Sequence, residues 1–143
     1  MARTAIGSII DELVTIEAAL TGTKATYDEM PESIAATPAW LNFPLSGILN
    51  EHSGMSDDEH VIGCACVVRR ALSPSDETLM RPMITRFADA LSDNITLGGT
   101  VMSILETTYE YGLIETLSSP EDLMFGIMFR VRVHCQESIT VSA

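Results

Sequence analysis

A strictly alternating run near the end of the chain constrains the fold more than any other feature. Between residues 123 and 135 every second residue is apolar, while Arg130, Arg132 and His134 fall on positions between them. The apolar positions are Leu123, Phe125, Ile127, Phe129, Val131, Val133 and Cys135. Because successive side chains of a strand point to opposite faces, this run predicts a long strand with one buried face.

Two helical patterns can cover such a sheet. In residues 4–20 the apolar positions recur at helical spacing, with the carboxylates, Glu17 among them, on the expected exposed side. A second apolar stripe runs through residues 79–93, after a helix-start signal of serine, proline and aspartate. Pro82 lies inside this stripe, so we expect the helix to kink or to begin again there.

The rest of the chain predicts further strands and a fold class. We expect strands at residues 24–27, 39–44, 60–72 and 101–112, with turns at 97–100 and 118–122. The segregation of strands and helices predicts an α+β fold in a single domain over residues 1–143. Its sheet should be mainly antiparallel, with about four to five strands and two helices packed on one face. The polar tail after about residue 136 is expected to fray.

Residues 46–59 form the most loop-like stretch of the sequence. They contain several turn-forming residues and no basic residue. Their carboxylates are Glu51, Asp57, Asp58 and Glu59. Long loops without internal structure are uncommon in compact domains unless they serve a function. We therefore predict a flexible acidic loop that becomes ordered when the protein assembles with a partner.

Charge and composition limit the function classes. Eight basic and twenty acidic residues give a net charge of −12, which argues against non-specific binding to the phosphates of nucleic acids. No apolar run approaches the roughly 20 residues that cross a bilayer, and acidic residues interrupt the start of the chain early. We expect a soluble protein that is made in the cytosol, binds no membrane and does not hold DNA specifically.

No chemical motif in the sequence indicates an enzyme. The residues that come nearest to a metal or acid–base site are His52, His60, His134, Cys64, Cys66 and Cys135. Their spacing lacks the paired units of closed zinc sites, and no serine or cysteine occupies a nucleophile elbow. We expect no catalytic residue, no metal and no cofactor, with the cysteines as buried thiols and the histidines at a sheet rim.

Arginines give the strongest indication of an interaction surface. The predicted subunit or partner interface consists of Arg69, Arg70, Met124, Met128, Arg130 and Arg132. Arginine pairs with carboxylates through two hydrogen bonds and is enriched at interfaces. Methionine adapts to irregular apolar contacts. Solvated charges at a sheet edge explain the arginines equally well, and the sequence leaves this alternative open.

Five passages of the chain follow one another in an order found in a known family. They are YDEMPESIAATPAWLNFP at 27–44, HVIGCACVVRRAL at 60–72, RPMITRFADALSDNITLGGTV at 81–101, YEYG at 109–112 and LMFGIMFRVRVHC at 123–135. Together they resemble the tail terminator proteins of long-tailed bacteriophages, also called tail-completion or minor tail proteins. The resemblance extends over residues 3 to about 135 and rests on the pattern as a whole, because no single motif is diagnostic.

The resemblance implies a structural virion protein of the tail or neck with no catalytic residues. Such a protein forms a ring, expected to be a hexamer, on the head-proximal end of the tail tube. The ring ends tube polymerisation and docks the head-closure or connector protein, and DNA passes through it without specific binding. The implied partners are further copies of the chain, the tail tube protein and the connector, after synthesis in the host cytoplasm.

Three other interpretations stay open at this point. The first is a head-closure or connector neck protein of the same virion, because such neck proteins are built on a similar scale. A subunit of a non-phage contractile or secretion tube would have a similar sequence pattern. From another class, a small cytosolic enzyme or ligand-binding domain would need a convergent set of polar groups in a pocket.

Overall fold

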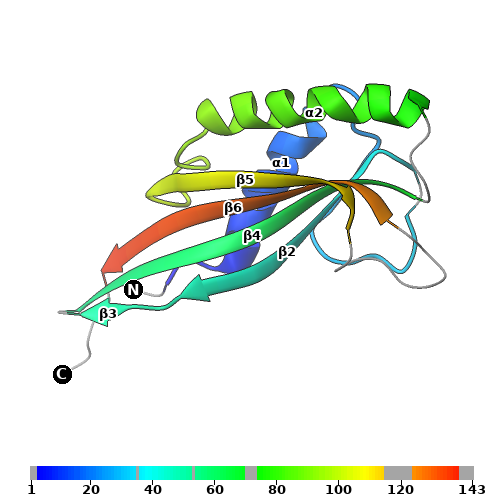
Figure 1. The fold of residues 1–143 in the computed structure, drawn as a ribbon. Coiled ribbons are helices and arrows are strands. Elements are labelled where there is room, and N and C mark those ends of the chain that lie inside the picture. Colours follow the sequence, from blue (N-terminus) through cyan, green and yellow to red (C-terminus); the bar gives the residue numbers. More distant parts are fainter. Residues whose placement is uncertain (1–2, 35, 53, 70–73, 115–123, 139–143) are drawn as a thin grey trace.

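The computed structural model describes residues 3–34, 36–52, 54–69, 74–114 and 124–138 (Figure 1). In chain order its elements are α1 (Ile6–Ala18), β1 (Ala25–Tyr27), β2 (Ala39–Ile48), β3 (Glu51–His52), β4 (Met55–Arg69), α2 (Pro74–Ser92), β5 (Ser103–Leu113) and β6 (Met124–Ser138). The strands form one sheet in the order β1-β2-β4-β6-β5, with the short β3 paired to β4. β1 runs parallel to β2, and the remaining described pairs are antiparallel.

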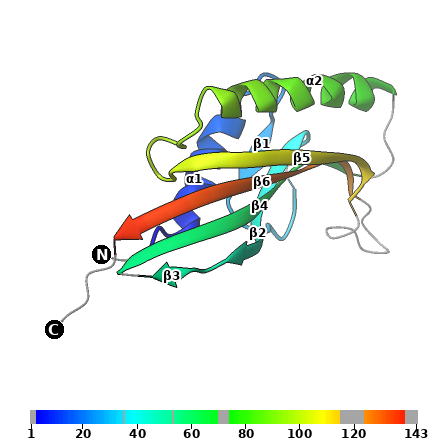
Figure 2. The same ribbon diagram turned by 60° about the vertical axis from the view of Figure 1, so that its left-hand side comes forward.

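Both helices pack on the same face of this sheet, which we call the helix face. In Figures 1 and 2, α2 runs alongside β5, and α1 lies behind the sheet. Buried residues of both helices belong to one core cluster with residues of β2, β4 and β6. The predicted α+β fold, with a mainly antiparallel sheet and two helices on one face, is therefore confirmed.

The core forms where the apolar stripes of the helices meet the apolar face of the sheet. α1 buries Ile9, Ile10 and Leu13, and α2 buries Met80, Met83, Phe87 and Leu91. At its centre, the rings of Trp40, Phe87 and Phe129 lie with centroids 4.6 to 5.6 Å apart. Burial of each such side chain stabilises the fold by roughly 1.5–3 kcal/mol. The alternation predicted for the last strand is confirmed, because the odd-numbered residues from Ile127 to Cys135 are buried.

The predicted flexible loop at residues 46–59 is wrong for most of its length. β2 continues through Pro44 to Ile48, β3 follows, and β4 begins at Met55. Residues 44–52 and 54–59 therefore form what we call the hairpin arm at one end of the sheet. The first residues of β4 pair in register with β6, from Met55 opposite Ser138 onward. This pairing satisfies the backbone of a segment whose composition favours turns.

The predicted interface needs a correction at Met124 and Met128. Both side chains are buried, with 7% and 4% of their surface exposed. They belong to a second, smaller core with Ala39, Leu41, Ala65, Val67 and Ile114, against which Ala25, Tyr27, Ile34 and Phe43 pack. The segment after β1 thus covers one end of the opposite sheet face, a tertiary contact that the pattern of β6 cannot reveal.

Smaller differences concern the ends of elements. α2 is one helix that contains Pro82, so the helix does not begin again there. β6 extends to Ser138, past the predicted start of the frayed tail. The turn at 97–100 is present, and its backbone is left-handed at Leu97, Gly98 and Gly99. The predicted turn at 118–122 lies outside the described residues.

Candidate functional site: the charged face of the sheet

The sheet face opposite the helices carries a strip of charged side chains. We call this strip the charged face. Its residues are Asp57 and Glu59 on β4, Glu106 and Glu110 on β5, and Arg130, Arg132 and His134 on β6. On β4 and β6 they alternate with the buried positions of the helix face, and Glu106 and Glu110 of β5 lie opposite Arg132 and Met128 of β6, on the same face. Among the described residues, no helix packs on this strip.

The two arginines bridge neighbouring strands. Arg130 Nη1 lies 3.3 Å from Glu110 Oε1 on β5. Arg132 lies between two strands, with Nη2 3.1 Å from Glu59 Oε1 on β4 and Nη1 3.6 Å from Glu106 Oε2 on β5. Their side chains remain 38% and 45% exposed. Exposed ion pairs of this kind contribute roughly 0–1 kcal/mol each, so they can exchange partners at little cost.

Next to the arginines, the charged face is hollowed. A hollow of about 310 Å³ is lined by Ile48, Asn50, Asp57, Glu59, Leu105 and His134. His134 Nε2 pairs there with Asp57 Oδ1. The hollow therefore combines an acidic floor with apolar side chains from β2 and β5 at its border.

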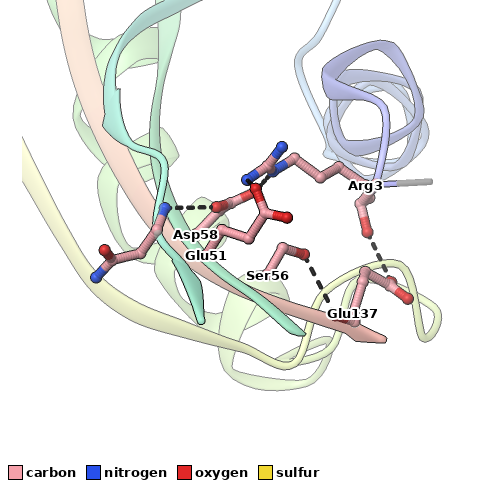
Figure 3. A network of polar contacts seen from close by, with 7 residues as sticks. Arg3, Glu51, Ser56, Asp58 and Glu137 are labelled. Carbon is pink, nitrogen blue, oxygen red and sulfur yellow. Dashed lines mark hydrogen bonds and ion pairs between the residues drawn. The ribbon is translucent and has the colours of Figure 1, made fainter. Parts of the chain in front are cut away.

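The outer half of the hairpin arm, around β3, is fixed by the N-terminal segment (Figure 3). Arg3 Nε donates a hydrogen bond to Asp58 Oδ2 at 2.9 Å, and Arg3 Nη2 lies 3.7 Å from Glu51 Oε2. Asp58 is nearly fully buried, and its Oδ1 accepts a hydrogen bond from the Asn50 amide at 2.9 Å. The Thr4 hydroxyl donates to Glu137 Oε1 at 2.9 Å. These contacts explain why the acidic arm is a hairpin and not a loop.

A buried polar cluster lies under α1. Glu17 is fully buried, which corrects its predicted place on the exposed side of the helix. Its Oε1 accepts a hydrogen bond from Asn42 Nδ2 at 2.7 Å. Burial raises the pKa of the Glu17 carboxyl to about 8, with the Asn42 and Cys64 side chains acting in the opposite direction. A signal for this was present, because Glu17 follows the core residue Leu13 by four positions.

The remaining residues singled out by the sequence are separated by the fold. The three cysteines are free and buried, and burial raises the pKa of each thiol, which keeps them protonated and unreactive. His60 is buried on the helix face, away from His134. The side chains of His52 and Arg69, and all of Arg70, lie outside what the structure describes. In the described part of the chain, no three His, Cys, Asp or Glu side chains are grouped to hold a metal ion.

Two further findings frame the functional question. Within the described ranges, none of the helices is long and apolar enough to span a membrane. No protein-family model and no curated protein matches the sequence. The charged face and the edges of the sheet are therefore the features of this protein that bear on its function.

Proposed function

We propose that this chain is a structural assembly subunit of a bacteriophage tail. Several copies form a ring, a hexamer by the resemblance described above, on the head-proximal end of the tail tube. The ring ends tube polymerisation and presents a docking surface for the head-closure or connector protein. The observation that best supports this proposal is the charged face, a strip of sheet with arginine–carboxylate pairs outside the helix-covered core.

The charged face suits a protein partner because its ion pairs are weak within one chain. In the described part of the chain, Arg130 pairs with the exposed Glu110, and Arg132 pairs with the exposed Glu106 and the partly exposed Glu59. A carboxylate of an approaching partner can join these pairs and accept hydrogen bonds from a guanidinium from which water is excluded. This addition strengthens the contact with little rearrangement of either backbone.

The overall charge supports passage of DNA and not its retention. The chain carries a net charge of −12, and the charged face has more carboxylates than arginines. A ring of such subunits repels phosphates, so a genome would move through its hole without specific binding. The same argument disfavours a role in packaging DNA by direct contact.

Reversing the two arginine charges tests the proposal. We expect Arg130→Glu with Arg132→Glu to leave the circular dichroism spectrum unchanged and to abolish control of tube length when tail tube protein polymerises in its presence. The fold should survive, since the lost ion pairs contribute roughly 0–1 kcal/mol each. The matched control, Lys24→Glu with Arg86→Glu, makes the same change in net charge away from the charged face and should retain activity.

Two outcomes would contradict this role of the arginines. The first is a double variant that is unfolded, together with an equally unfolded Arg130→Gln, Arg132→Gln variant, because the arginines would then belong to the fold. The second is a folded charge-reversal variant that controls tube length as the wild type does.

A further inference from the structure

The described sheet has an open edge on each side, one along β2 and one along β5. On one side of the described sheet, no strand pairs with the outer edge of β5. At the other end, β1 covers β2 only from Ala39 to Leu41. Beyond Leu41, the outer edge of β2 as far as Ile48 has no neighbouring strand among the described elements. An open edge offers backbone donors and acceptors to another strand.

The open part of β2 lacks the charges that usually protect an edge. The sequence contains no charged residue between Glu32 and Glu51. Along the hairpin arm, Leu45, Ile48 and Leu49 are 36%, 57% and 66% exposed. Pro44 and the register shift between Pro44 and Ser46 interrupt this edge, but no charged side chain protects it, and an apolar edge is a site for pairing with another chain.

The outer edge of β5 also exposes apolar side chains, and it lies beside a hollow. Leu105 and Tyr109 are exposed there, and the nearby Glu106 and Glu110 are already paired with arginines. A hollow of about 280 Å³ separates β5 from α2. Its lining consists of Ala88, Leu91, Ser92, Ile95, Ile104, Leu105, Glu106 and Thr107. This hollow can receive apolar side chains from a strand placed beside β5.

The match between the two edges favours a second copy of the chain as the occupant. Two copies that each carry a net charge of −12 repel one another over most of their surfaces. The uncharged β2 edge and the internally neutralised β5 edge are two strips on which this repulsion is weakest. A contact between them also buries the exposed apolar residues of both.

Strand direction fits the same pairing. β2 is antiparallel to β4, β4 to β6, and β6 to β5. β5 is therefore antiparallel to β2 of its own chain. A second copy in the same orientation, placed beside the first, brings its β2 next to β5 as an antiparallel pair. Such a head-to-tail contact leaves one edge open on each copy, so it propagates until a ring closes.

We infer that residues 42–48 of one copy pair with residues 103–109 of β5 of the next copy and continue its sheet. This inference names the subunit contact of the ring and rests on the proposed function for ring closure. The pairing itself requires only a second copy of the chain. Ile48 and Leu49 then lie level with the first residues of β5, beside the exposed Leu105.

Two complementary variants test the contact. Ile48→Lys with Leu49→Lys blocks the arm edge, and Leu105→Lys with Thr107→Lys blocks the β5 edge. Each variant alone should lower self-association at least about tenfold, measured by native mass spectrometry. An equimolar mixture should form a dimer that does not grow, because one intact edge remains on each partner. Leu79→Lys, which replaces an exposed apolar residue on α2 and not on either strand edge, should assemble like the wild type.

The outcomes separate this inference from the proposed function. Single-edge variants that assemble like the wild type would overturn the pairing, and so would a mixture that stays monomeric while the wild type associates. A wild type that never self-associates, alone or on tube ends, would also overturn it. If the mixture dimerises but the wild type does not bind tail tubes, the strand pairing is supported and the tail role is contradicted. If the variants still cap tubes, the tail role stands and the pairing fails.

Discussion

Replacing Glu17 with glutamine should remove most of the pH dependence of stability between pH 5 and pH 8. Glu17 is fully buried beneath α1, where its Oε2 and the Asn42 Oδ1 have no hydrogen-bond partner among the described residues. Burial disfavours the charged carboxylate, so the pKa in the folded protein is about 8. In the unfolded chain the same carboxyl titrates near its ordinary pKa of 4.5. At neutral pH the folded protein therefore holds a proton that the unfolded chain has released.

The sign and the size follow from proton linkage. Between pH 4.5 and pH 8 the folded state binds the extra proton, so stability falls as pH rises through this window. Below pH 4.5 the Glu17 carboxyl is protonated in both the folded and the unfolded state. Above pH 8 it is ionised in both states, and the full loss of folding stability is present. At about 1.4 kcal/mol per pKa unit, the gap between 4.5 and about 8 corresponds to at most about 5 kcal/mol. That is a large share of the 5–15 kcal/mol typical of a domain.

Urea denaturation of the wild type and Glu17→Gln at a series of pH values measures this effect. The free energy of unfolding of the wild type, minus that of the variant, should fall by about 1.4 kcal/mol per pH unit between pH 5 and pH 7.5 and level off above pH 8. Asp11→Asn, an exposed carboxylate on the same helix, serves as the matched control and should give a flat difference. A flat difference for Glu17→Gln, or one that rises with pH, would refute the reasoning.

Two further predictions concern the backbone and the hairpin arm. Gly126→Ala should lower the melting temperature by at least about 5 °C, because a Cβ there would lie 2.0 Å from the Cys66 carbonyl oxygen. Gly112→Ala, also at positive φ but with nothing within 4 Å, should cost clearly less, and equal losses in thermal scans would contradict this. Arg3→Ala should cost about 1–3 kcal/mol by leaving the buried Asp58 short of a partner. Adding Asp58→Asn should then cost less than the sum of the single changes in urea titrations, and full additivity would count against the contact.

The strand and helix patterns were predictable where the determining contacts are local. The alternation of Phe129, Val131 and Val133 places one face of β6 in the core whatever the rest of the chain does. The same holds for the stripe of Met83 and Phe87 on α2. Secondary structure is predictable in these segments because the periodicity of their apolar residues lies within the segment itself.

The hairpin arm was not predictable in the same way. Its turn-forming residues and carboxylates are typical of a loop, but Arg3 and Arg132 lie 55 and 73 residues from the carboxylates that they meet. Only the folded sheet brings these charges together. Met128 was misplaced for a related reason, because Ile34 and its neighbours pack against that core from a distant segment.

The prediction for Glu17 was wrong for a different reason, because its charge led us to expect it on the exposed side of α1. The helical stripe through Leu13 already placed it on the buried side. The charge of Glu17 predicted exposure and its spacing from Leu13 predicted burial, and the spacing was correct. Such a conflict marks a group whose pKa the fold must shift.

The most direct test of the tail role uses tail tubes assembled without this protein, mixed with the purified chain and imaged at their ends by negative-stain electron microscopy. The proposal predicts a ring that caps one end of each tube and a fixed tube length thereafter. Binding to connector-bearing heads and not to tubes would contradict it and assign the chain to head closure. Binding to neither would contradict both roles and favour the enzyme or ligand-binding interpretation.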